Sequence, residues 1–202
     1  MHMKGFSVLE VMIVIALLTV VMGTIFSVAS SVQRTADMQQ ARATAHDEVR
    51  RAIQTIARDL RLAARSSVSA LPAAQIKYRV AVDLDGNGSA LDVHGGIELS
   101  PERVIMRDRD DVNHDGARHE QLILVDGDAV RVLANGLAPD EDLDGDGLLD
   151  EGEDTNGNGR LDHGIWFGSS GIGVEAVIET QVAYRPRRIV GASLSELVVP
   201  RN

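Results

Sequence analysis

Hydrophobic positions divide the chain into three parts, and the first is apolar almost throughout. Within residues 6–30, the 18 residues from Val11 to Val28 carry no charge. About 20 apolar residues span the hydrocarbon core of a bilayer, so this segment predicts a membrane helix. Lys4 precedes it, and Arg34 is the first basic residue beyond it. The basic leader favours a single pass through the membrane with the N-terminus in the cytoplasm.

In the second part, residues 31–66, apolar positions repeat with the spacing of one helix face. They fall at Ala45, Val49, Ile53, Ile56, Leu60 and Ala63. Arginines occupy much of the opposite face, as in a helix with one buried side. No Pro or Gly lies between Thr24 and Leu71. The pattern therefore predicts one continuous helix from Phe6 to about Arg65.

Beyond Pro72 the apolar positions alternate with polar ones, which predicts β-strands. Strands are expected at 75–82, 103–106, 120–125, 129–133, 173–184 and 194–200. The third and fourth of these read as a hairpin with Gly127 in its turn. A helix that lays its apolar stripe across an antiparallel sheet is an α+β fold. We expect a globular domain at 31–202 that follows the membrane helix.

Composition adds one constraint and one clue. The chain of 202 residues has no Cys and is only 3% aromatic, so the core is aliphatic and disulfides are excluded. The net charge of −10 is concentrated in residues 140–162, which hold ten acidic residues and one basic residue, Arg160. Like charges at this density repel one another unless cations are bound. The acidic segment therefore predicts a cation site.

That segment contains a calcium-loop pattern that repeats after twelve residues. "DLDGDGLLDEGE" (142–153) has acidic residues at positions 1, 3, 5, 9 and 12 and Gly at position 6. Alternate side chains and the last Glu bind the ion in such loops, and position 7 contributes its carbonyl oxygen. The second copy, 154–165, ends in Ile165, so we expect it to bind more weakly. The predicted ligands are Asp142, Asp144, Asp146, Leu148, Asp150 and Glu153 in the first copy, and Asp154, Asn156, Asn158, Arg160 and Asp162 in the second.

Two shorter stretches, "DLDGNG" and "DVNHDG", match the first half of the pattern and lie between strand candidates. Their weaker candidate ligands are Asp83, Asp85, Asn87 and Asp92 in the first, and Asp111, Asn113, Asp115 and Glu120 in the second. Asp-Gly and Asn-Gly pairs also form turns without metal, so both interpretations stay open. No helices flank the tandem at 140–164, which is similar to thrombospondin type 3 and dockerin-type loops. Calcium would then replace the missing disulfides as a staple.

The residues "KGFSVLE" place Lys4, Gly5, Phe6 and Glu10 at the spacing of a known processing site. The segment from Lys4 to about Val28 resembles type IV prepilins and type II secretion pseudopilins. The resemblance implies removal of the leader 1–5 by a prepilin peptidase, which cleaves between Gly5 and Phe6 and also N-methylates Phe6. It implies that Glu10 is an assembly contact, which meets the amine of Phe6 on a neighbouring subunit. A carboxylate inside a membrane is tolerated when such a partner exists.

The stretch "IARDLRLA" (56–63) resembles the same helix region in minor pilins of the PilW type and in the J-type minor pseudopilin. The resemblance implies a pilin-like structural subunit that helps to initiate or cap a type IV pilus. It implies other pilin or pseudopilin subunits as partners, and passage from the inner membrane into a periplasmic or cell-surface fibre. The alternatives are a minor pseudopilin of a type II secretion system and a calcium-dependent tip adhesin.

The chain lacks a nucleophile elbow, a P-loop and an HExxH motif, so we do not expect an enzyme. The basic run from Tyr184 to Arg188 is the strongest candidate for contact with nucleic acid. Because it is short and belongs to an acidic protein, we interpret it as a solvated strand end.

Overall fold

The chain forms two units, Met1–Gln40 and Ala41–Asn202, which are described separately below. A single helix, α1 (Val8–Leu62), contributes to both. The computed structural model describes residues 8–70, 74–92, 94–116, 120–142, 148–154, 159, 161, 163–170, 173–185 and 188–200.

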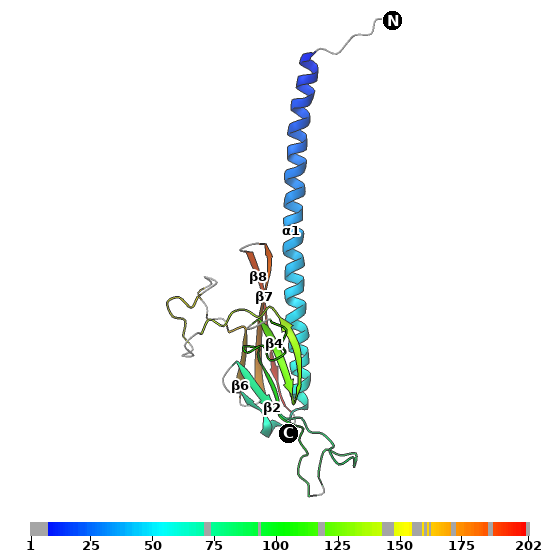
Figure 1. Ribbon diagram of the computed structural model, residues 1–202, viewed down its shortest axis with the longest axis vertical. Helices are drawn as coiled ribbons and strands as arrows, with labels where there is room; N and C mark the ends of the chain where they lie inside the picture. Colours follow the sequence, from blue (N-terminus) through cyan, green and yellow to red (C-terminus); the bar gives the residue numbers. More distant parts are fainter. Residues whose placement is uncertain are drawn as a thin grey trace. The chain divides into compact units, whose positions relative to one another are not determined.

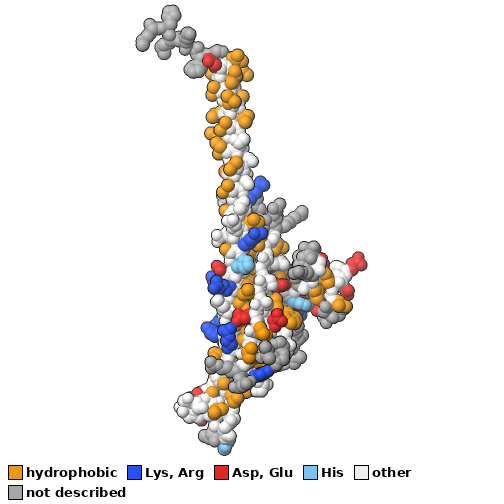
Figure 2. Space-filling model, turned by 180° about the vertical axis from the view of Figure 1, so that it is seen from behind, with side chains coloured by type: hydrophobic (Ala, Val, Ile, Leu, Met, Phe, Trp, Pro, Cys, Tyr) orange, Lys and Arg blue, Asp and Glu red, His pale blue; other side chains and the backbone are white. Residues whose placement is uncertain are grey.

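In the first unit, α1 is exposed and apolar. Its large side chains from Val8 to Val28 are each at least 47% exposed, and an 18-residue window has a mean hydropathy of 2.7 with none of it buried. This helix is long and apolar enough to cross a membrane. Figure 2 shows hydrophobic side chains along the visible face of this part of the helix, whereas Lys and Arg gather beside its C-terminal part.

The C-terminal part of α1 belongs to the second unit and confirms the predicted stripe. Ala45, Val49, Ile53, Ile56 and Leu60 are each at most 1% exposed. The helix ends at Leu62, three residues before the predicted Arg65, and a 3-10 turn, η1 (Arg65–Ser67), follows. The reason is a change of backbone partner: Ala63 bridges Val80, and the Ala64 N–H donates to the carbonyl of Arg79.

The second unit holds two antiparallel sheets rather than the one expected (Figure 1). The first sheet has the order β1-β2-β3-β4-β5, and the second has the order β6-β7-β8. Their strands are β1 (Ser69–Ala70), β2 (Gln75–Tyr78), β3 (Arg103–Arg107), β4 (Gln121–Asp126), β5 (Ala129–Asn135), β6 (Ile165–Ser170), β7 (Gly173–Arg185) and β8 (Arg188–Val198). Each neighbouring pair is antiparallel, so the α+β prediction holds.

The two sheets and the helix share one aliphatic core. Buried residues from α1, β2, β3, β4 and β5 form a single cluster with residues from β6, β7 and β8. An isolated antiparallel bridge between Leu137 and Thr180 joins the segment after β5 to β7. The Thr180 hydroxyl also donates to the carbonyl of Ala45 at 3.1 Å, which ties β7 to α1.

Most strand limits differ from the prediction by one or two residues, the short strand β1 was not predicted, and the largest differences are at β2, β8 and β6. β2 ends at Tyr78, and only isolated bridges at Val80 and Ala81 continue toward residue 82. β8 begins at Arg188, because it pairs with β7 along most of its length. The sequence did not predict β6, whose short apolar run "IWF" precedes Gly and Ser. The β4–β5 hairpin is confirmed, and Gly127 has the expected positive φ of 60°.

Candidate metal-binding loops

Three of the four predicted loops share one turn geometry. The first Asp of each loop accepts a hydrogen bond from the N–H of the glycine at position 6: Asp83 from Gly88 at 2.7 Å, Asp111 from Gly116 at 3.0 Å, and Asp154 from Gly159 at 2.9 Å. The three glycines have φ between 71° and 85°, a region that glycine adopts without steric cost. The six-residue half of the pattern therefore specifies a turn by itself.

The first tandem loop is described at its start and end. Asp142 is half-buried, Leu148 and Asp150 are exposed, and Glu153 is only 6% exposed. The Asp150 N–H donates to Glu153 Oε2 at 3.0 Å, so the residues at positions 9 and 12 lie together. Of the other predicted tandem ligands, Asp154 is half-buried. Asp144, Asp146, Asn156, Asn158, Arg160 and Asp162 lie outside the described residues.

Both ends of the tandem are held on the sheets by Arg107. Its Nη2 donates to the carbonyl of Ala138 at 2.6 Å and to that of His163 at 2.9 Å. The β7 residue Glu179 adds two backbone bonds to the same ends: the Ala138 N–H donates to its carbonyl, and its own N–H donates to the Gly164 carbonyl. The chain just before the tandem and the chain just after it therefore meet at one place on the sheets.

The two ends of the tandem, residues 138–140 and 163–164, form a stem on the sheets. Ion pairs at this stem balance its charges. Burial lowers the pKa of the Arg107 guanidinium from its ordinary value, the negative charge of Asp140 opposes that shift, and Arg109 adds to it. Asp140 is bound by Arg109 Nη2 at 2.5 Å, and its other oxygen lies 3.4 Å from His163 Nδ1. The stem is thus a mixed-charge cluster around one buried arginine.

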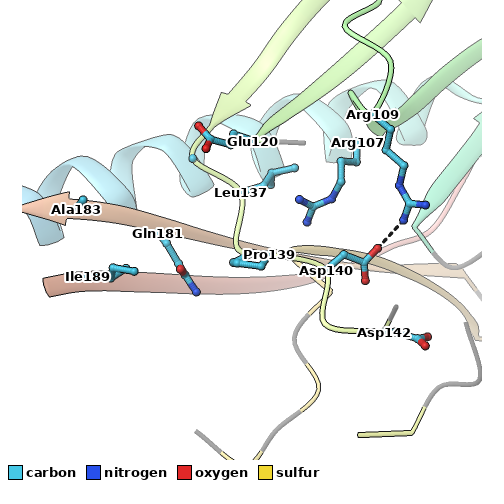
Figure 3. Close-up of a pocket in the computed structure, with 11 residues that line it drawn as sticks. Arg107, Arg109, Glu120, Leu137, Pro139, Asp140, Asp142, Gln181, Ala183 and Ile189 are labelled. Atoms are coloured by element: carbon cyan, nitrogen blue, oxygen red, sulfur yellow. Dashed lines mark hydrogen bonds and ion pairs between the residues drawn. The ribbon is translucent and has the colours of Figure 1, made fainter. Parts of the chain in front are cut away.

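A cavity of about 660 Å³ lies beside the stem (Figure 3). Arg107 and Arg109 line it together with Pro139, Asp140 and Asp142, and β7 contributes Gln181. Figure 3 shows the Arg109–Asp140 pair over this space. Glu120, predicted as a ligand of the 111–116 loop, is exposed and lines this cavity.

The loop at 83–98 brings three carboxylates together. Ligand oxygens of Asp83, Asp85 and Glu98 all lie within 4.8 Å of one another. The Gly88 N–H, with those of Gly86 and Asn87, lowers the pKa of Asp83 below its ordinary value. Asp92 does not belong to this group, because its Oδ1 accepts the N–H groups of His94 and Gly96 in its own turn.

Sequence reasoning missed Glu98, which stands beyond the twelve-residue window. It returns to the loop because Val82 donates to the Glu98 carbonyl and Ala81 bridges Leu99, so the chain doubles back like a hairpin. The alternation of Ile97, Glu98 and Leu99 was a signal of an extended return strand. Only pairing with Ala81 and Val82, however, fixes which acidic residue meets Asp83.

The loop at 111–116 lies against Gln121 rather than Glu120. Asn113 Nδ2 donates to Gln121 Oε1 at 2.8 Å, and Gln121 Nε2 donates to Asp115 Oδ2 at 2.8 Å. Asp108, just before the loop, is fully buried. Neither Gln121 nor Asp108 was singled out from the sequence, because their roles depend on the pairing of β3 with β4.

At the N-terminus, Gly5 and Phe6 lie outside the described residues, whereas Glu10 is exposed in the first turn of α1. Searches of family models, curated proteins and solved structures found no match to this chain.

Proposed function

We propose that the chain is a minor pilin, a structural subunit that helps to initiate or cap a type IV pilus. The division of α1 carries the proposal. Its N-terminal part is exposed and apolar over a membrane's thickness, and the same helix continues without a break into the core of an antiparallel domain. Such a helix suits a subunit that is held in the inner membrane and then assembles with other pilin subunits through the same helix.

Processing is the first test of this proposal. Protein recovered from filaments should begin at Phe6 and carry an N-methyl group, as seen by mass spectrometry of its N-terminal peptide. Gly5→Leu places a large side chain at the cleaved bond and should leave the leader attached. Filament protein that keeps Met1 or Met3 would contradict the prepilin interpretation.

Glu10 is the second test. It is the sole ionisable residue between Val8 and Val28, and in a membrane such a carboxylate needs a partner. Glu10→Val should leave membrane insertion intact and abolish incorporation into filaments. Thr19→Val is the matched control, because it also replaces a polar group of the span, one whose hydroxyl donates within the helix to the Ile15 carbonyl. Equal incorporation of the two variants would refute the pairing.

The alternatives make different demands on the cell. A minor pseudopilin has the same leader and the same helix, but its deletion should stop protein secretion and leave surface pili in place. Deletion of a minor pilin should remove surface pili and leave protein secretion in place. Deletion of a calcium-dependent tip adhesin should leave the number of pili unchanged and abolish only the attachment to surfaces that requires calcium.

We further propose that the tandem at 142–162 binds calcium and that the ion stabilises the globular domain. The support is the ligand spacing together with the inward position of Glu153 beside Asp150. Binding at a hundredfold excess over Kd contributes about 2.7 kcal/mol to the free energy of unfolding. The full chain in detergent should therefore melt at a higher temperature in calcium than in chelator.

A pair of neighbouring variants tests the register of this loop. Glu153→Gln removes the closing carboxylate at position 12 and should abolish most of the calcium-dependent rise in Tm. Glu151→Gln removes a charge two residues away, at a position that is exposed and outside the ligand pattern. If both variants lose the same fraction of the rise, net charge rather than a site accounts for the calcium effect.

A further inference from the structure

The loop after β3 contains half of a calcium-loop pattern and lacks its usual end. Counted from Asp111, position 12 is Leu122, which is fully buried in the core. No carboxylate can close the loop from there. A cation held by Asp111, Asn113 and Asp115 therefore requires an additional ligand from elsewhere in the fold.

Asp108 has the properties of that ligand. Its side chain is fully buried, and Oδ1 accepts the N–H of Val112, so the carboxylate faces the loop. Oδ2 is buried and accepts no hydrogen bond from the described residues. Arg107 cannot neutralise it, because consecutive residues of an extended chain point to opposite faces and Arg107 binds the stem of the tandem.

Asp108 Oδ2 is unusual because it is buried and has no hydrogen-bond partner among the described residues. A buried carboxylate with an unsatisfied oxygen is costly, and native proteins rarely keep one unless an ion or another group completes it. Among the described residues, no Lys, Arg or His forms an ion pair with Asp108. The fold therefore places an incomplete anionic ligand under an acidic loop.

The loop and Asp108 meet at the same strand position. Asp108 directly follows the end of β3, and its N–H donates to the carbonyl of Gln121, the first residue of β4, so the two residues lie opposite each other. The Gln121 side chain is only 5% exposed and is covered by Asn113 and Asp115 of the loop. Asp108 and the loop's polar side chains thus lie on the same face of the sheet.

We propose that Asp108 and the loop at 111–116 form a calcium site in which Asp108 Oδ2 supplies the closing carboxylate. Side-chain oxygens of Asp111, Asn113 and Asp115 complete the all-oxygen ligand set that this hard cation prefers. At Asp115 a metal–oxygen bond then replaces the hydrogen bond from Gln121 Nε2, whereas Asn113 binds through Oδ1 and can keep the bond from its Nδ2 to Gln121. This site depends neither on the tandem loops nor on assembly into a filament.

The first experiment counts bound ions. The full chain in detergent, depleted of metal, is titrated with calcium chloride by calorimetry, and bound calcium is measured after gel filtration. Asp108→Asn should bind one calcium fewer per chain than the unmodified protein. Asp110→Asn, an equal change at an exposed neighbouring position, should bind the full number. Identical stoichiometry and affinity in the two variants would overturn the proposal.

The second experiment separates an ion ligand from a structural hydrogen bond. In chelator, Asp108→Asn removes an uncompensated buried charge, so its Tm should equal or exceed that of the unmodified protein. In calcium the order should reverse, because only the unmodified protein gains the ion. A Tm that falls equally in calcium and in chelator would show that Asp108 serves only to bind Val112, and would refute the site.

Discussion

Arg107 provides the sharpest test of how the acidic tandem is attached. The substitution Arg107→Met keeps a long apolar side chain and removes the guanidinium that binds the Ala138 and His163 carbonyls. Arg107 is 5% exposed and Ala138 is 2% exposed, so water cannot readily replace the lost donor. Among the described residues, the backbone bonds of Glu179 and the contact between Asp140 and His163 would remain to hold the two ends of the tandem.

The magnitude follows from two opposing effects. A hydrogen bond to a charged group contributes about 1.5–3 kcal/mol, and Arg107 makes two to these carbonyls. The lowered pKa shows that burial disfavours its charge, which offsets part of that gain. We expect a net loss of about 2–4 kcal/mol in the free energy of unfolding. For a small domain that is a large fraction of the total stability.

Arg109→Met is the matched control. Arg109 stands two residues away and pairs with Asp140, but its side chain is 56% exposed. Exposed ion pairs contribute about 0–1 kcal/mol, so this variant should stay close to the unmodified protein. Urea unfolding gives the free energies, and limited proteolysis reports cleavage within residues 139–163. Equal losses in the two variants, or faster cleavage in neither, would refute the role assigned to Arg107.

Three further predictions concern single residues. Gly164→Ala should lower Tm more than Gly152→Ala: both glycines have positive φ, but a Cβ at Gly164 would meet the Ala138 carbonyl and Arg107, whereas Gly152 has open space around it; equal losses would contradict the close packing. Asp83 should titrate below its ordinary pKa of 3.8. Its contribution to loop stability is therefore complete above pH 3.8 and is lost as the pH falls through the lower pKa of the folded state. An NMR titration midpoint at or above 3.8 would contradict this. Tyr78→Phe should cost about 1 kcal/mol in urea unfolding, because the fully buried hydroxyl donates to Asp59 at 3.4 Å; an unchanged midpoint would show that this bond adds nothing.

The elements that the sequence predicted well are those whose signal is local and long. The stripe from Ala45 to Leu60 repeats over several helical turns, and each of its predicted residues is buried. The β4–β5 hairpin has alternating strands and a glycine at the turn. In each case neighbouring residues alone determine both the element and its buried face.

The missed features depend on contacts between distant segments. The run Ile165–Phe167 is too short to identify a strand by period, and it becomes β6 only through pairing with Val177 and its neighbours. The division into two sheets depends on the segment around Leu137, which leaves β5 and bridges Thr180. The sequence around Leu137 alone does not show that this segment pairs with Thr180 of β7.

The acidic loops combine both situations, and this explains why their ends were hard to predict. Positions 1 to 6 are self-contained, because the Asp carboxylate and the glycine N–H close the turn within six residues. A further carboxylate can reach such a turn only where the fold returns the chain to it. Glu98 lies at that place beside Asp83 and Asp85, and we propose that Asp108 closes the site beside Asp111. At Leu122 and Ile165 the twelfth position belongs to buried strands instead.

This conflict between loop pattern and core gives a final prediction. If the local pattern decided binding, Ile165→Glu would complete the second tandem loop and enlarge its calcium response. Ile165 is 1% exposed and pairs with Ile178 at the start of β6, so the new carboxylate would instead enter the aliphatic core. Burying an unpaired charge costs several kcal/mol, and the lost Ile packing adds about 2–5 kcal/mol. We therefore expect Tm to fall steeply in calcium and in chelator alike, with Ile165→Val falling only slightly in both; a Tm that calcium restores to that of the unmodified protein would show that the loop can draw residue 165 out of the strand.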